Sequence, residues 1–211
     1  MVREQIASRG IADEAVLNAM ERVLRERFVL PGYEDRAYDD SPLPIGSGQT
    51  ISQPFIVAQM SAALEIEPGD RVLEIGAGSG YGAAVLAEMG AEVYSIEVDA
   101  ELAAQARRRL AELGYDNVRV IHADGTQGWR EAAPYDAISV TAGGPHLPDA
   151  LEEQLVPGGR LVIPLGPTAG AQTLVQLRHC EGGGFRERSL GLVRFVPLVS
   201  THGTAPGRSG K

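Results

Sequence analysis

Three glycines follow a short apolar run about a third of the way along the chain. The run, residues 72–75, is typical of a strand that is buried on both faces. Directly after it come Gly76, Gly78 and Gly80, and a helix-like segment follows. A strand that breaks into a glycine turn at a helix N-terminus lets backbone N–H groups approach a ligand closely. The spacing is not the dinucleotide fingerprint, which would need Gly or Ala where Tyr81 stands. An ordinary tight turn between strand and helix is the alternative.

Two carboxylates occupy comparable places after the next two expected strands. Glu97 ends the second strand about 20 residues after the glycine turn, where a carboxylate can accept hydrogen bonds from two ribose hydroxyls and would repel the 2′-phosphate of NADP. Asp124 and Gly125 follow the third strand, where the carboxylate could accept from an exocyclic amine such as that of adenine. The alternatives are a solvated residue before a helix for Glu97 and a turn-former for Asp124. A single nucleoside-binding crevice explains all three features together.

The pattern Glu74-x-Gly76-x-Gly78-x-Gly80 resembles the first motif of S-adenosylmethionine-dependent methyltransferases. This resemblance implies S-adenosylmethionine as the cofactor and places Glu74 in its site. A glycine triad of this kind occurs in many methyltransferases, so it indicates the methyl donor and says little about the acceptor.

The elements that must position these residues alternate from residue 71 onward. Strands are expected at 72–75, 92–97, 118–122, 135–141 and 160–163, with helices at 81–89, 101–113 and 151–155 between them. This alternation predicts an α/β fold with a parallel sheet and helices on both faces. After Gly170 two strand-like runs, 172–179 and 189–199, are separated by a short glycine-rich turn, which predicts an antiparallel pair at the sheet edge.

The first 65 residues contain helical patterns and one irregular segment. Two short helices are expected within residues 1–30, the second with Asp13 as its N-cap. From Pro31 to Pro54 the apolar residues show neither a helical nor a strand period. We interpret this segment as a substrate-facing loop without secondary structure. A helix then runs over 55–64, with Phe55, Val57, Ala58 and Ala62 expected to be buried.

Composition excludes several classes of partner. Among the 211 residues the net charge is −9 and 44% are apolar, so one well-packed domain is expected and binding through nucleic-acid phosphates is disfavoured. The single cysteine, Cys180, allows neither an intramolecular disulfide nor a cysteine-rich metal site, and no histidine pair has metal-ligand spacing. No apolar run approaches the roughly 18 residues that cross a bilayer. We expect a cytoplasmic monomer without metal, nucleic-acid or membrane partners.

The fourth strand limits the methyl acceptor. Amine- and base-modifying enzymes often place a polar side chain after this strand, whereas Thr141-Ala-Gly-Gly-Pro145 offers no such group. Cys180 lies late in a strand, so a cysteine nucleophile for cytosine chemistry is also absent. A carboxylate acceptor fits better, because it is already ionised at neutral pH and needs only placement and partial neutralisation.

Several further segments resemble one family closely, the protein-L-isoaspartate O-methyltransferases. The resemblance covers about residues 2–199, and its most specific part lies upstream of the glycines. The segments that carry it are Gln5-Ile6, Arg9-Gly-Ile11, Arg27-Phe-Val29, Ala37-Tyr38, Pro42-Leu-Pro-Ile-Gly46, Gly48-Gln-Thr-Ile-Ser-Gln-Pro54, Gly128-Trp129, Gly158-Gly-Arg-Leu-Val-Ile-Pro164 and Val193-Arg-Phe-Val-Pro-Leu198.

The resemblance implies an activity and a set of roles. Such enzymes methylate the free α-carboxylate of L-isoaspartyl residues in damaged proteins, and the ester closes to a succinimide. Ser52 matches the active-site serine and would orient the carboxylate, although an N-cap of the following helix is the alternative. The matching also implies that Gln49, Thr50 and Ile51 wall the pocket, and that a strand over 193–198, with Val193, Phe195 and Val196, lies alongside the substrate.

The chain departs from the family pattern at a few positions. Gly82 stands where glutamine is common, which would loosen the first helix turn, and Leu24 replaces a usual proline. The resemblance implies a Rossmann-like, doubly wound, mostly parallel sheet in one domain over residues 1–203. That domain divides into N-terminal helices and substrate loop (1–65), a cofactor-binding core (70–165) and C-terminal strands (170–200), and 204–211 is expected to be a disordered tail. Two other functions stay open: methylation of a small carboxylic acid, and a catalytically silent cofactor-binding module.

Overall fold

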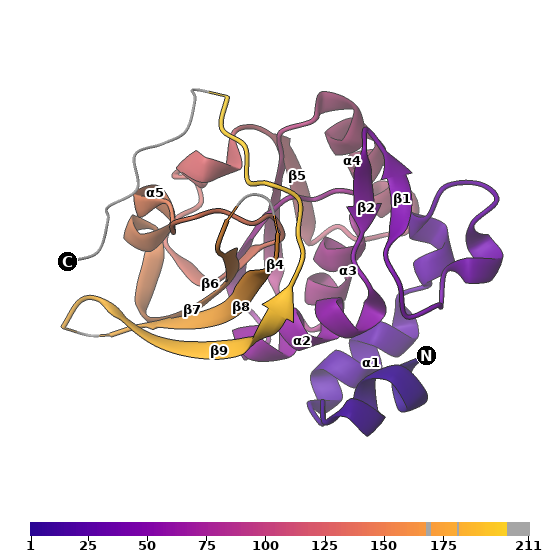
Figure 1. The fold of residues 1–211 in the computed structure, drawn as a ribbon. Coiled ribbons are helices and arrows are strands. Elements are labelled where there is room, and N and C mark those ends of the chain that lie inside the picture. Colours follow the sequence, from indigo (N-terminus) through magenta and orange to yellow (C-terminus); the bar gives the residue numbers. More distant parts are fainter. Residues whose placement is uncertain (168–169, 181, 202–211) are drawn as a thin grey trace.

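Within the described residues, the sheet that carries the glycine turn has seven strands in the order β5-β4-β3-β6-β7-β8-β9 (Figure 1). The computed structural model describes residues 1–167, 170–180 and 182–201, so the expected tail at 204–211 lies outside the described part. Strands β3 to β7 are parallel, whereas β8 and β9 pair antiparallel. Their bounds are β3 (Arg71–Ile75), β4 (Glu92–Glu97), β5 (Val118–His122), β6 (Tyr135–Val140), β7 (Leu155–Leu165), β8 (Gln172–His179) and β9 (Phe185–Val193).

The order of the strands reverses between β3 and β6. From β3 the chain moves outward through β4 and β5 on one side, and it returns to the other side of β3 at β6. In such sheets ligands bind beyond the carboxyl ends of the strands at this point. The glycine turn follows β3 directly, so the predicted doubly wound α/β sheet puts it at the expected place for a ligand.

Helices connect the parallel strands and cover both faces of the sheet. Val72 packs in a core with residues of the helices α1 to α4, whereas the next residue, Leu73, packs in a second core that includes Leu151 of α5. Asp13 and Asp99 cap α1 and α4 by accepting from backbone N–H groups, and the cap at Asp13 confirms its prediction from the sequence. The helices are α1 (Glu14–Arg22), α2 (Pro54–Leu64), α3 (Tyr81–Glu88), α4 (Ala100–Glu112) and α5 (Asp149–Glu153), with short 3-10 or π turns η1 (Val2–Ile6), η2 (Ala7–Arg9), η3 (Arg25–Phe28), η4 (Glu34–Arg36) and η5 (Gly125–Gln127).

The segment from Pro31 to Pro54 is not a loop without secondary structure, so that prediction was wrong. It contains the 3-10 turn η4 and an antiparallel hairpin of β1 (Leu43–Gly46) and β2 (Gln49–Ile51). Gly46, Ser47 and Gly48 all have positive φ and form the hairpin turn. Prolines and glycines hide the period of two in strands this short. Figure 1 shows the hairpin with β2 on the side nearer α3 and α4 and with other N-terminal segments outside β1.

Two smaller expectations were also wrong. The last strand is β9, which ends at Val193, and the following residues cross the sheet edge as an extended segment held by Gly143. Most side chains of β9 are exposed, so hydropathy gave no guide to its start. On α2 only Ala58 of the four expected residues is buried, because its buried face is formed instead by Pro54, Ala58, Met60, Ser61, Ala63 and Leu64. Among the described residues, none of the helices has the length and apolar character that spanning a bilayer requires.

Candidate functional site

A cavity of about 810 Å³ lies at the carboxyl end of β3 and is walled by three parts of the chain. The hairpin and the start of α2 form one wall, the glycine turn forms the floor, and residues after β9 form the opposite wall. Residues 194–201 are here called the strap; Figure 1 shows it in yellow, crossing the sheet on the side that faces the hairpin. Cavities of 300–1,000 Å³ are typical of small-molecule and cofactor sites.

The glycine turn fits closely against the neighbouring strand end. Gly76 has a φ of 95°, and a Cβ on it would lie 2.3 Å from Oγ1 of Thr141. The Thr141 hydroxyl contacts the carbonyl oxygens of Ile75 and Gly76, each at 2.9 Å. A side chain at position 76 would therefore displace the residue that joins β6 to the turn. Gly78 and Gly80 share the positive φ and, of these two, Gly78 lines the cavity.

Glu97 lies at the predicted place and holds the turn from below. Its carboxylate accepts from the N–H of Gly78 at 2.8 Å and from the N–H of Asp99 at 3.0 Å, and it is 7% exposed. An ionised carboxylate offers about four acceptor positions, so these two bonds leave capacity for ligand hydroxyls. Glu97 lines the cavity, and its predicted contact with a ribose stays a prediction.

Asp124 has partners that the sequence did not suggest. Its carboxylate accepts from the N–H and hydroxyl of Thr126, from the hydroxyl of Ser200, and from the N–H and hydroxyl of Thr201. Burial alone would raise the pKa of this carboxyl, but the hydrogen bonds outweigh it and hold the pKa well below its usual range. Gly125 lines the cavity, whereas Asp124 anchors the strap. Its predicted contact with adenine stays a prediction.

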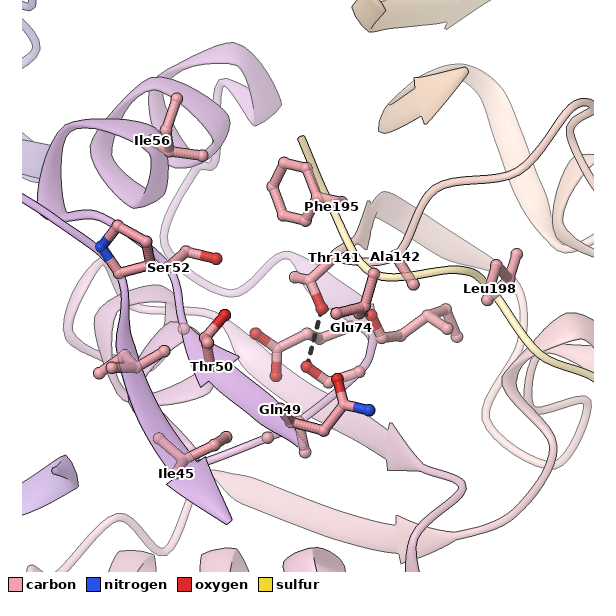
Figure 2. Close-up of a pocket in the computed structure, with 18 of the residues that line it drawn as sticks. Ile45, Gln49, Thr50, Ser52, Ile56, Glu74, Thr141, Ala142, Phe195 and Leu198 are labelled. Atoms are coloured by element: carbon pink, nitrogen blue, oxygen red, sulfur yellow. Dashed lines mark hydrogen bonds between the residues drawn. The ribbon is translucent and has the colours of Figure 1, made fainter. Parts of the chain in front are cut away.

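Ser52 follows β2 directly and lines the cavity. Figure 2 shows its hydroxyl directed into the space between the hairpin and the strap, toward Phe195. The N-cap of α2 is Gln53, and within the described residues no side chain makes a capping bond there. The alternative role of Ser52 as an N-cap is therefore wrong. Gln49, Thr50 and Ile51 line the same wall, as predicted.

Sequence reasoning missed the residues that hold Ser52 in place. Asp40 accepts from the Gln53 side chain at 2.7 Å and from the Phe55 N–H at 3.4 Å, and it forms an ion pair with Arg9. Nη2 of Arg25 donates to the carbonyl oxygen of Ser52 at 2.8 Å. No local pattern marks either Asp40 or Arg25, because their partners come from distant parts of the chain.

Glu74 lies in the cavity floor with its side chain inside the fold. It is 2% exposed, and the hydroxyl of Ser95 donates to it. Burial raises the pKa of Glu74 to about 8, the charge of Glu97 adds to the rise, and the Ser95 bond opposes it. A Cβ at Gly82 would lie 2.3 Å from Oε1 of Glu74. Gly82 thus makes room for this carboxyl, a role beyond the looser helix turn that the sequence suggested.

The strap brings its residues to the cavity by backbone bonds. The N–H of Gly143 donates to the carbonyl of Val196 at 2.8 Å, and the N–H of Leu198 donates to Gly143 at 2.7 Å. The N–H of Phe195 donates to the Gln172 side chain at 2.9 Å. Val193, Phe195 and Val196 all line the cavity, so the three residues expected beside the substrate are brought together opposite Ser52. Their contact with substrate stays a prediction.

The described residues contain no group of three or more His, Cys, Asp or Glu side chains that could hold a metal ion. The expectation that no metal takes part stays a prediction. The cavity instead combines a glycine floor, two carboxyl groups and several hydroxyl-bearing residues, among them Ser52, with apolar walls that include Ile45, Ile56 and Leu198. Such a site suits a ligand with an apolar body and a few hydrogen-bonding groups.

Two relatives are similar over nearly the whole chain. A protein-L-isoaspartate O-methyltransferase 2 of Pelobacter propionicus is 56% identical over 203 residues, which is 96% of this chain and 90% of that protein. A protein-L-isoaspartate O-methyltransferase of Gloeobacter violaceus is 55% identical over 199 residues, which is 94% of this chain and 97% of that protein.

Solved structures give the same result at lower identity. A protein-L-isoaspartate O-methyltransferase superposes with a TM-score of 0.85 and 27% identity, covering 96% of this chain and 67% of that one. A protein of this type from Plasmodium falciparum, in complex with S-adenosyl-L-homocysteine, has a TM-score of 0.78 and 28% identity, covering 94% and 96%. The family model for protein-L-isoaspartate(D-aspartate) O-methyltransferase matches residues 1–203. The chain belongs to the protein-L-isoaspartate(D-aspartate) O-methyltransferase family.

Proposed function

We propose that the protein transfers a methyl group from S-adenosylmethionine to the free α-carboxylate of L-isoaspartyl residues in damaged proteins and peptides. The methyl ester then closes to a succinimide, which opens partly to normal aspartate. The observation that carries this proposal is one cavity that joins the glycine turn to Ser52. The names of the relatives support the same acceptor.

The residues of the cavity floor fit the cofactor. Because Gly76 and Gly78 have no side chains, a ligand can approach their backbone closely. Glu97 keeps positions that can accept hydrogen bonds from a ligand in the cavity. When bound, S-adenosylmethionine supplies an electrophilic methyl group on a sulfonium centre. Glu74, Gly80 and Gly125 complete the proposed set on the donor side, and Gln49, Thr50 and Ile51 border it from the hairpin.

The acceptor needs placement and not activation. An α-carboxylate has a pKa of roughly 3.5, so it is an anionic nucleophile at neutral pH without a general base. In this proposal the hydroxyl of Ser52 donates a hydrogen bond to one carboxylate oxygen, which leaves the other free to react. Val193, Phe195 and Val196 form the facing wall, where the extended strap offers backbone groups to a peptide.

Methyl transfer to paired peptides tests the proposal. The purified protein is given labelled S-adenosylmethionine and either an isoaspartyl peptide or its aspartyl isomer of the same sequence. We expect label only in the isoaspartyl peptide. Equal labelling of both peptides would overturn the proposal, and labelling of small carboxylic acids without any peptide would indicate a metabolite methyltransferase.

We also propose that the protein acts as a monomer in the cytoplasm on protein substrates, without nucleic-acid or membrane partners. The net charge of −9 supports the exclusion of nucleic acid, because phosphate contacts depend on clustered lysine and arginine. Sedimentation of the protein at micromolar concentration tests the oligomeric state. A dimer that persists on dilution would contradict it.

A further inference from the structure

Arg25 carries a charge and is the largest fully buried side chain among the described residues. It begins the turn η3, between α1 and the segment that leads to the hairpin. Nε donates to the carbonyl of Ala37 at 2.7 Å and Nη2 donates to the carbonyl of Ser52 at 2.8 Å. The guanidinium carbon lies 4.7 Å from the ring centroid of Tyr81. The remaining nitrogen, Nη1, is buried without a hydrogen-bond partner among the described residues.

The charge of this guanidinium is not neutralised by an ion pair. Each ion pair between described residues uses another arginine, and none joins Arg25 to a carboxylate. Burial lowers the pKa of Arg25, and the nearby Tyr81 and Asp40 oppose the change. Arginine nevertheless keeps its proton inside proteins. A buried charge without a counter-charge is unfavourable, and an anion placed nearby would offset this cost.

The cavity is the place where such an anion would arrive. Ser52 and Tyr81 both line the cavity, and both also contact the guanidinium of Arg25, which does not line it. Arg25 therefore lies directly behind the wall that carries the Ser52 hydroxyl. The other carboxyl groups at the cavity, Glu74 and Glu97, belong to its floor below the glycine turn and bond to Ser95 and Gly78. On the acceptor side, the carboxylate of Asp40 lies near Arg25, but it already accepts from Gln53 and Phe55, pairs with Arg9 and does not line the cavity.

We propose that Arg25 is a positioning residue for the acceptor, whose buried charge attracts the ionised substrate carboxylate to Ser52 while its hydrogen bond fixes the Ser52 backbone. This inference rests on the proposed function, because it requires a carboxylate to bind beside Ser52. A charge behind an apolar wall acts through a medium of low effective dielectric, so it is screened less than an exposed one.

The experiment compares two peptides that differ only in charge. One is the isoaspartyl peptide, and the other has its α-carboxylate replaced by a neutral carboxamide. Dissociation constants are measured by calorimetry with the wild type, Arg25→Met and Arg25→Lys, each saturated with S-adenosylhomocysteine. We expect Arg25→Met to weaken binding of the carboxylate peptide roughly 10- to 30-fold and binding of the carboxamide peptide less than about threefold. The Arg25→Lys variant keeps the charge and should recover most of the difference.

Two further variants separate charge from structure. Arg160 also donates to a buried backbone carbonyl, that of Leu64, but it pairs with Asp70 and does not line the cavity, so Arg160→Met should leave the preference for the carboxylate unchanged. Arg194 lines the cavity but is exposed, so its screened charge should matter less than that of Arg25.

Each outcome has a definite meaning. Equal weakening of both peptides by Arg25→Met would show a purely structural role and overturn the inference. Loss of the preference in Arg194→Met but not in Arg25→Met would assign the charge to the strap and also overturn it. If the wild type itself does not prefer the carboxylate peptide, the proposed function fails instead. Binding of S-adenosylhomocysteine by each variant shows that the donor side is folded.

Discussion

The hydroxyl of Ser52 reaches the cavity from a connection that is fixed on both sides. Asp40 accepts hydrogen bonds from Gln53 and Phe55, which follow Ser52, and Arg25 donates to the carbonyl oxygen of Ser52. The Ser52 hydroxyl therefore has a defined direction. We predict that Ser52→Ala lowers kcat for an isoaspartyl peptide roughly 10- to 100-fold, because the carboxylate loses the group that orients it. The dissociation constant of S-adenosylhomocysteine should stay close to that of the wild type.

Ser8→Ala serves as the control for this substitution, because the Ser8 hydroxyl bonds only to the exposed backbone of η1 among the described residues. Its kinetics should match those of the wild type. Unchanged turnover in Ser52→Ala would remove Ser52 from the reaction.

Glu74 makes the stability of the fold depend on pH in a direction unusual for a carboxyl group. Its pKa rises from 4.5 to about 8 on folding, so the folded state holds the proton more tightly than the unfolded state. The resulting stabilisation is complete below the unfolded pKa and is lost as pH rises toward 8. We predict that the wild type loses stability relative to Glu74→Gln over this range, by at most about 1.4 kcal/mol per pH unit.

Urea unfolding of both proteins between about pH 5 and about pH 8 checks this prediction. Parallel pH profiles would mean that Glu74 ionises normally inside the fold. The comparison uses the free energy of unfolding, so it does not depend on catalysis.

At the scale of elements, the carboxylate of Asp124 contributes to holding the far end of the strap. Asp124 accepts from the hydroxyls of Ser200 and Thr201, and hydrogen bonds to a charged group contribute roughly 1.5–3 kcal/mol each. We predict that the double substitution Ser200→Ala with Thr201→Val lets the strap open more often. Amide hydrogen exchange at Gly143, whose N–H donates to Val196, and at Leu198 should accelerate roughly tenfold or more, whereas exchange in β3 should not change.

An unchanged exchange rate along the strap would show that its bonds to Gly143 are sufficient to hold it. Faster exchange in β3 as well would mean that the variant has lost stability as a whole. The outcomes are distinct because β3 is a central strand and the strap lies at the surface.

The strands were predictable where an apolar run is bounded by turn residues. The bounds of β4, β5 and β8 match the expected ones because each run begins and ends beside such residues. The hairpin was not predictable, since Pro44, Gly46 and Gly48 interrupt strands of only three or four residues. The glycine turn and Ser52 were found because each carries a motif. Arg25 was not, because a charged residue between two helices suggests the surface and only tertiary contacts bury it.

At the scale of the whole molecule, the net charge of −9 should influence which peptides arrive fastest. We predict that at low ionic strength kcat/KM is several-fold higher for an isoaspartyl peptide with flanking lysines than for one with flanking glutamates. Added salt should bring the two values together, because surface charges act over roughly 10 Å at 0.1 M salt. Steady-state kinetics at two salt concentrations provide the measurement. A difference that survives high salt would indicate direct contacts in the cavity instead.

The strap also has a consequence for the synthesis of the protein. The donor floor is built from β3, β4 and the turns after them, all of which precede the strap by many residues in the chain. A ribosome that has just translated β8 has therefore produced every residue of that floor and of the Ser52 wall, but not the wall that faces them. The growing chain can pair β3 to β8 before β9 and the acceptor pocket exist. The facing wall is added only when residues 194–201 emerge and Ser200 and Thr201 donate to Asp124.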